Sequence, residues 1–187
     1  GLAIAEKLVM EGYEVYGLGR DFSKPDRKLQ VDVDIPTDTN LQVDTDLRAD
    51  INCKVDRLNV DEQHMDTRFH KITCDLCNTK KLIETIQSIN KDHDISLLIN
   101  NAGVGYYGLH EELSPQKISQ MVRTNLEVPM IITNLLLRDL KKNAGIIVNT
   151  SSVTAGKSNP HGCVYGATKA GLTSFSHSLF DEARKYG

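Results

Sequence analysis

Two short apolar runs, each ending in polar residues, constrain the fold of this chain more than any other feature. The runs are ISLLIN at residues 95–100 and IIVNTSS at residues 146–152. Short continuous apolar runs of this kind are typical of strands buried on both faces of a parallel sheet. Two further candidate strands and four candidate helices alternate with them: strands over 13–19 and 69–76, and helices over 2–11, 79–91, 115–142 and 164–187. This order predicts an α/β fold, with helices covering both faces of a parallel sheet.

The carboxyl ends of the candidate strands are where a ligand is expected. In open parallel sheets, ligands bind in the crevice beyond these ends. The residues that follow or close the four strands are Gly19, Asp75, Asn100 and Ser151. We therefore expect the functional residues to gather at this one edge of the sheet.

Length and charge exclude several classes of protein. The 187 residues predict a single domain over 1–187. A net charge of -3 gives no broad basic surface, so no nucleic-acid partner is expected. No apolar run approaches the roughly 20 residues that a membrane-spanning helix needs, so no membrane contact is expected. A cytoplasmic location fits these properties.

The cysteines give little evidence for metal or redox chemistry. Cys74 and Cys77 form a C-x-x-C pair, whereas Cys53 and Cys163 stand alone. A single such pair, with no second pair and no nearby histidines, is weak evidence for zinc. We expect reduced thiols and no metal site.

Residues 29–64 interrupt the alternation of strands and helices. The dipeptide Val-Asp recurs there every twelve residues, beginning at Val31, Val43 and Val55. The segment holds nine acidic and three basic residues. It lacks the glycine and the closing glutamate of an EF-hand calcium loop. We interpret it as an acidic, solvated insertion within the single domain.

Tyr165 and Lys169 are the first candidates for chemistry. They lie four residues apart in a candidate helix, so their side chains share one face. A nearby ammonium favours the phenolate form of tyrosine, which allows the phenol to exchange a proton with a substrate. Ser152 precedes Tyr165 by thirteen residues, and its hydroxyl could bind the same substrate oxygen. Taken alone, the tyrosine–lysine pair is equally typical of a solvated helix face.

Two asparagine-containing segments add to this pattern. NNAG at residues 100–103 directly follows an apolar strand, either as a plain turn or as a close backbone approach to a ligand. Asn125 lies inside an apolar helix, where asparagine is a poor helix former. Its side chain could bond to local backbone, or it could hold a water beside Lys169.

Together, these pieces resemble the short-chain dehydrogenases/reductases. The matching segments are NNAG, RTNLEVP, IIVNTSSV and YGATKAG, in that order. The resemblance implies a Rossmann-like doubly wound parallel sheet. It also implies hydride transfer between a nicotinamide cofactor and a small carbonyl or alcohol. The catalytic residues that it implies are Asn125, Ser152, Tyr165 and Lys169. In that family the tyrosine is the acid/base, the lysine also holds the nicotinamide ribose, the serine positions the carbonyl oxygen and the asparagine supports a proton relay.

The resemblance also implies a set of cofactor contacts. They are Gly1, Arg20, Asp75, Leu76, Asn101, Ala102, Gly103, Tyr165 and Lys169. Arg20 follows Gly19 at the place where an acidic residue would bind the ribose of NAD, which favours NADP, with NAD possible. Asp75 would contact the adenine amino group, or it could cap the next helix.

The sequence departs from the family at both ends. Gly1 resembles the last glycine of the family's phosphate loop, so an internal fragment is expected, with a sheet that lacks its central first strand. A non-catalytic nucleotide-binding domain or an inactive fragment is the alternative to an enzyme. Tyr106, Tyr107 and His110 could line the substrate pocket, or they could be loop surface. The helices over 115–142 and 164–186 resemble the family's dimer-forming pair, which implies a homodimer or homotetramer.

Overall fold

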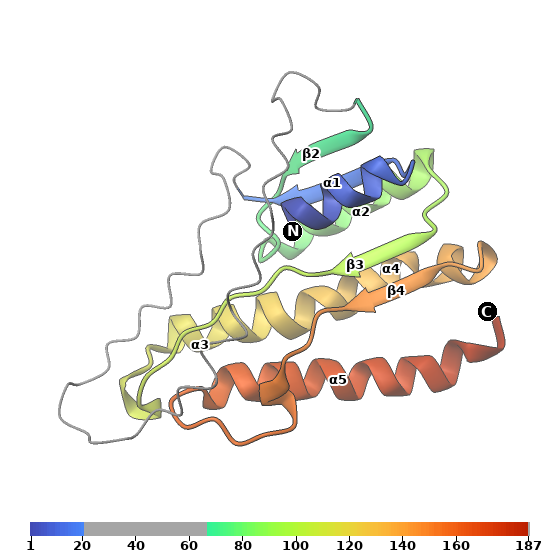
Figure 1. Ribbon diagram of the computed structural model, residues 1–187. Helices are drawn as coiled ribbons and strands as arrows, with labels where there is room; N and C mark the ends of the chain where they lie inside the picture. Colours follow the sequence, from blue (N-terminus) through green and yellow to red (C-terminus); the bar gives the residue numbers. More distant parts are fainter. Residues whose placement is uncertain (21–66, 187) are drawn as a thin grey trace.

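The computed structural model describes residues 1–20 and 67–186, in which helices and parallel strands alternate (Figure 1). The predicted insertion at 29–64, with Cys53, lies outside the described residues. The strands are β1 (Val15–Gly19), β2 (Phe69–Thr73), β3 (Leu97–Asn100) and β4 (Ile146–Asn149). The α-helices are α1 (Leu2–Met10), α2 (Thr79–Asp92), α3 (Pro115–Val122), α4 (Val128–Lys142) and α5 (Cys163–Ala183). Single 3₁₀ turns cover His110–Glu112, Val153–Ala155 and Arg184–Tyr186.

Side-chain caps fix where two of the helices begin. The Asn78 side chain accepts a hydrogen bond of 3.1 Å from the Lys81 amide at the start of α2. Ser114 accepts one of 3.3 Å from the Lys117 amide, and Pro115 occupies the first turn of α3. Both caps satisfy amide groups that a helix leaves without an internal partner. The predicted start of the third helix at Ser114 and Pro115 is therefore confirmed.

The helix expected over 115–142 is interrupted by a π-helical turn at Arg123–Glu127. This turn lies between α3 and α4, and Asn125 is at its centre. Pro129 gives a physical reason, because it has no amide hydrogen to donate to the carbonyl of Asn125 four residues earlier. The expectation of one regular helix was wrong at these five residues, which widen into a π-helix, a form often found at functional sites.

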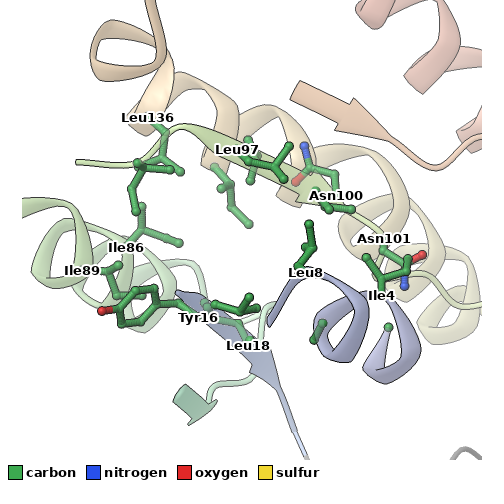
Figure 2. A pocket seen from close by; sticks show the side chains of 18 of the residues that line it. Ile4, Leu8, Tyr16, Leu18, Ile86, Ile89, Leu97, Asn100, Asn101 and Leu136 are labelled. Carbon is green, nitrogen blue, oxygen red and sulfur yellow. The ribbon is translucent and has the colours of Figure 1, made fainter. Parts of the chain in front are cut away.

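The strands form two parallel pairs. β1 pairs with β2 from Val15 opposite Phe69 onward, and β3 pairs with β4 from Leu97 opposite Ile146 onward. A cavity of about 670 Å³ separates the pairs. Figure 2 shows this cavity, with side chains from α1, β1, α2, β3 and α4 pointing into it. No described strand lies between β1 and β3, which agrees with the expectation of a sheet that lacks its central strand.

The hydrophobic core lies where α2 and α4 pack together against the strands. Its buried residues are Leu82, Ile86, Val128, Ile132, Leu136 and Leu140. Ile147 of β4 packs against this core, whereas Ile146 and Val148 on the same strand are 62% and 42% exposed. Among the described residues, α4 and α5 contact β4, and no helix covers the face that carries Ile146 and Val148.

The described helices include none that is both long and apolar enough to pass through a membrane.

Candidate functional site

The four strands point the same way, and their carboxyl ends lie toward one side of the molecule (Figure 1). The parallel register sets Gly19 opposite Thr73 and Asn100 opposite Asn149. The polar residues that follow the strands therefore gather at one edge, as the sequence predicted. The site is built from these strand ends and from the first turns of α5.

Lys169 and Tyr165 lie on α5, one turn apart. Lys169 is only 4% exposed, and its Nζ donates a hydrogen bond of 2.6 Å to the main-chain oxygen of Thr150, just after β4. The same ammonium lies 5.9 Å from the centroid of the Tyr165 ring. Burial lowers the pKa of Lys169 below its ordinary value, because the charged form loses hydration. The alternative of a solvated helix face is therefore wrong for Lys169.

Asn125 joins the loop after β3 to α5. It is fully buried, and its Oδ1 accepts a hydrogen bond of 2.8 Å from the Val104 amide. Its Nδ2 donates to the Val104 carbonyl at 2.8 Å and to the Thr168 hydroxyl at 3.1 Å. The backbone that it binds is 21 residues away in sequence, so the alternative of a local backbone bond was wrong.

The NNAG segment combines structural and site contacts. The Asn100 side chain donates a hydrogen bond of 2.8 Å to the Asn149 side chain and thereby joins β3 to β4. Asn101 accepts a hydrogen bond of 3.3 Å from the Thr150 hydroxyl. A Cβ at Gly103 would lie 3.5 Å from Asn125 Oδ1 and 3.7 Å from Lys169 Nζ. Because Gly103 has no side chain, a small open space remains beside the buried ammonium.

The two adjacent serines differ in their contacts. Ser151 Oγ lies 2.6 Å from the Thr173 hydroxyl and donates a hydrogen bond of 3.3 Å to the Lys169 carbonyl. Ser151 therefore packs against α5. Ser152 Oγ accepts hydrogen bonds from the amide and the hydroxyl of Thr154, at 3.2 and 2.9 Å. Sequence reasoning missed Thr150 and Thr154, although each lies two residues from the predicted Ser152.

Of the three loop residues considered as pocket lining, Tyr107 is the one that contacts Tyr165. Their ring centroids are 5.7 Å apart, with the planes inclined at 46°. Burial raises the pKa of the Tyr107 phenol, and the proximity of Tyr165 raises it further. The Tyr106 hydroxyl instead donates a hydrogen bond of 2.8 Å to the Gln120 side chain on α3, and His110 is exposed on a 3₁₀ turn. Loop surface is therefore the correct description for His110.

A second, shallower cavity of about 440 Å³ lies at the ends of β1 and β2. Arg20, Asp75, Cys77 and Arg123 line it, together with four residues of α3: Pro115, Gln116, Ser119 and Gln120. The Asp75 carboxylate accepts a hydrogen bond of 3.1 Å from the Cys77 amide, so Asp75 caps its own turn. Arg123 was not among the residues predicted from the sequence, which contains no local signal for its position here.

The structure divides the predicted cofactor contacts among three places. Arg20 and Asp75 line the shallow cavity, and Gly103 lies beside Lys169. Tyr165 lies one turn from Lys169 on α5. The remaining four contacts line the large cavity between the strand pairs: Gly1, Leu76, Asn101 and Ala102. Among residues 1–20 and 67–186, no group of three or more His, Cys, Asp or Glu side chains could hold a metal ion.

Comparison with known proteins agrees with this site. The sequence profile of a family described as short chain dehydrogenase matches residues 51–187. A serine 3-dehydrogenase of Rhizobium radiobacter is 30% identical over 183 residues, which cover 96% of this chain and 59% of that enzyme. The crystal structure of a short-chain dehydrogenase from Streptomyces avermitilis covers all of this chain with a TM-score of 0.74 and 23% identity, over 58% of its own length. The predicted Rossmann-like α/β fold is confirmed.

Several of the matched solved structures carry a nicotinamide cofactor, NADP in some and NADH in another. A metagenomic short-chain oxidoreductase in complex with NADP is 25% identical to this chain, with a TM-score of 0.60. The matched region covers 63% of this chain and 54% of that protein. The chain spans about half the length of the curated relatives that it matches.

Proposed function

Since this chain belongs to the short chain dehydrogenase family, we propose that it carries the cofactor site and the proton donor of an NADP-dependent carbonyl reductase or alcohol dehydrogenase. The substrate is a small molecule with a carbonyl or hydroxyl group. Tyr165 is the acid/base, Lys169 its cationic partner, Ser152 the ligand of the substrate oxygen and Asn125 the residue that orders the loop beside them. The complete protein performs the reaction, and residues 1–187 supply these four side chains.

The burial of Lys169 is the observation that carries this proposal. A buried ammonium is costly unless it is paired or hydrogen-bonded. Among the described residues, the Nζ of Lys169 donates one hydrogen bond, to Thr150, although an ammonium has three N–H donors. The remaining donors are suited to ribose hydroxyls. The Tyr165 ring lies within reach of the same charge, 5.9 Å from its centroid, and the charge stabilises the phenolate when it forms.

The proton chemistry follows from these positions. The nicotinamide cofactor, when bound, supplies or accepts the hydride at the substrate carbon. The Tyr165 hydroxyl gives its proton to the carbonyl oxygen, and the resulting phenolate is stabilised by the Lys169 ammonium. The Ser152 hydroxyl, already held by Thr154, donates a hydrogen bond to the same oxygen. In the direction of alcohol oxidation, the Tyr165 phenolate takes the proton from the hydroxyl group.

The residues present fit a nicotinamide dinucleotide. Gly103 leaves the space beside Lys169 free of a side chain, so a ribose can approach the ammonium. Asp75 and Arg20 line the shallow cavity, where they suit an adenine amino group and a ribose phosphate respectively. Arg20 in place of an acidic residue favours the 2′-phosphate of NADP over the free hydroxyl of NAD.

Binding of NADPH and NADH, followed by cofactor fluorescence, tests this proposal. We expect the chain to bind NADPH more tightly than NADH, and Arg20→Asp to remove or reverse that preference. Lys169→Met should weaken both cofactors, whereas Lys157→Met, at an exposed lysine before α5, is the matched control and should weaken neither. Equal affinity for the two cofactors in the unmodified chain contradicts the NADP assignment. Equal effects of the two lysine substitutions contradict the site.

A further inference from the structure

Two arginines line the shallow cavity of about 440 Å³. Arg20 directly follows β1, and Arg123 is the first residue of the π-helical turn after α3. Among residues 1–20 and 67–186, the one carboxylate that lines the cavity is that of Asp75, which accepts a hydrogen bond of 3.1 Å from the Cys77 amide of its own turn. The described lining therefore holds two guanidinium groups and one carboxylate.

Helical spacing along α3 gives Arg123 its position, since its amide donates to the Ser119 carbonyl four residues earlier. Arg123 is the first residue of the five-residue turn, where the helix is wider than an α-helix. Its neighbours on α3 that line the same cavity are Ser119 and Gln120. Arg123 follows Ser119 by four residues and Gln120 by three, so it lies on the cavity-lining side of this helix, two residues before the buried Asn125.

Neither arginine is fully committed to a protein partner. Arg123 Nε lies 3.4 Å from Glu127 Oε2, an exposed pair one helical turn apart. Such exposed pairs contribute little to stability, and a single contact through Nε leaves the terminal N–H groups of the guanidinium free to donate. Within the described part of the chain, Arg20 forms no ion pair with a carboxylate.

We propose that Arg123 is a second anion-binding residue of the nucleotide site, which holds a phosphate monoester together with Arg20. This inference rests on the proposed function and adds to it a residue that determines cofactor specificity. A phosphate monoester carries between one and two negative charges at neutral pH and offers three acceptor oxygens. Two guanidinium groups that line the same cavity from different elements match that charge and number of acceptors better than one. The ligand class is an adenine nucleotide with a phosphate on its ribose.

A substitution at Glu127 distinguishes direct phosphate binding by Arg123 from a purely structural role of Arg123. The Glu127 carboxylate competes with a phosphate for the Arg123 guanidinium, so Glu127→Gln should strengthen phosphate binding while Arg123→Gln weakens it. If Arg123 mattered only through its ion pair with Glu127, both substitutions would remove the same contact and shift binding in the same direction.

Calorimetric titration of the full chain with 2′,5′-ADP and with 5′-AMP provides the test, because these probes differ in the ribose phosphate. A hydrogen bond to a charged group contributes enough that Arg123→Gln should weaken 2′,5′-ADP by about tenfold. Its effect on 5′-AMP should stay within about twofold, since that probe lacks the phosphate in question. Arg138→Gln, at an exposed arginine on α4, is the matched control and should alter neither affinity.

The failures of the two proposals are separable. If both probes bind and Arg123→Gln leaves the affinity for 2′,5′-ADP unchanged, or lowers both affinities equally, the role of Arg123 is overturned and the nucleotide site stands. If Arg123→Gln and Glu127→Gln shift 2′,5′-ADP binding in the same direction, the role of Arg123 is likewise overturned. If neither probe binds the unmodified chain, the nucleotide site itself is overturned, and the role of Arg123 with it.

Discussion

The Nζ of Lys169 donates a hydrogen bond of 2.6 Å to the main-chain oxygen of Thr150, which joins α5 to the end of β4 at the centre of the site. This bond fixes an ammonium group that is almost completely buried. Because burial disfavours the charged form and lowers the pKa of Lys169, the proposed cofactor site predicts binding that depends on pH.

We expect the affinity for NADPH to fall as the pH rises through the lowered pKa of Lys169. An ordinary lysine loses its proton near 10.5, and burial moves that loss to lower pH. Loss of the proton removes the charge and one N–H donor, so the affinity decreases on the alkaline side. The pH dependence of NADPH fluorescence should show this decrease in the unmodified chain. The Lys169→Met variant should bind NADPH weakly, and its affinity should show no such decrease at alkaline pH. An identical alkaline profile in both proteins would contradict the assignment of this decrease to Lys169.

Tyr165→Phe should abolish most of the turnover while leaving cofactor affinity nearly unchanged. The substitution keeps the ring that contacts Tyr107 and removes the exchangeable proton. General acid catalysis contributes about 10²- to 10⁴-fold, so a loss of that size is expected in the complete enzyme. Tyr106→Phe is the matched control, because its hydroxyl is bonded to Gln120 on α3. Near-normal turnover of Tyr165→Phe with a ketone substrate would contradict the role of the phenol.

Asn125→Ala should destabilise the fold. The buried side chain makes three hydrogen bonds, two of them to the backbone of Val104. Its removal leaves a buried amide and a carbonyl without partners, at a cost of about 2–4 kcal/mol in the free energy of unfolding. Asn143→Ala removes a single bond of 3.2 Å to the Ile95 carbonyl and should cost about 1 kcal/mol. Urea denaturation of both variants measures the difference, and equal losses would show that Asn125 is not a structural junction.

The parts of the site that follow from local periodicity could be predicted from the sequence. Tyr165 and Lys169 share a helix face because they are four residues apart, and Ser152 follows a strand whose apolar pattern is plain. The helix start at Ser114 is marked by its cap and by Pro115.

The parts that depend on tertiary contacts could not be predicted in this way. Arg123 lines the shallow cavity together with Arg20 and Asp75, and this meeting of α3 with the ends of β1 and β2 leaves no local pattern in the sequence. The contact between Tyr107 and Tyr165 joins a loop to helix α5 across 58 residues of sequence, and no local pattern indicates it.

Gly145→Ala should destabilise the junction between α4 and β4. A Cβ at Gly145 would lie 2.7 Å from a methyl carbon of Leu140 and 2.8 Å from the main-chain oxygen of Ser96. The methyl group of Leu140 can move, but the carbonyl of Ser96 accepts the Ile146 amide at 2.9 Å in the strand pairing. Overpacking of this kind costs about 1–3 kcal/mol, and the loss should be visible as a lower urea midpoint.

Gly156→Ala is the matched control for this substitution. A Cβ at Gly156 meets no atom within 4 Å, and the φ angle of -114° suits alanine. Replacing glycine by alanine at such a position removes freedom from the unfolded chain, so stability should be unchanged or rise by up to about 1 kcal/mol. The two variants make the same chemical change in different surroundings. A lower urea midpoint for Gly145→Ala alone identifies steric contact with the Ser96 carbonyl as the cause. Equal urea midpoints for the two variants would show that the α4–β4 junction accommodates the added Cβ without loss of stability.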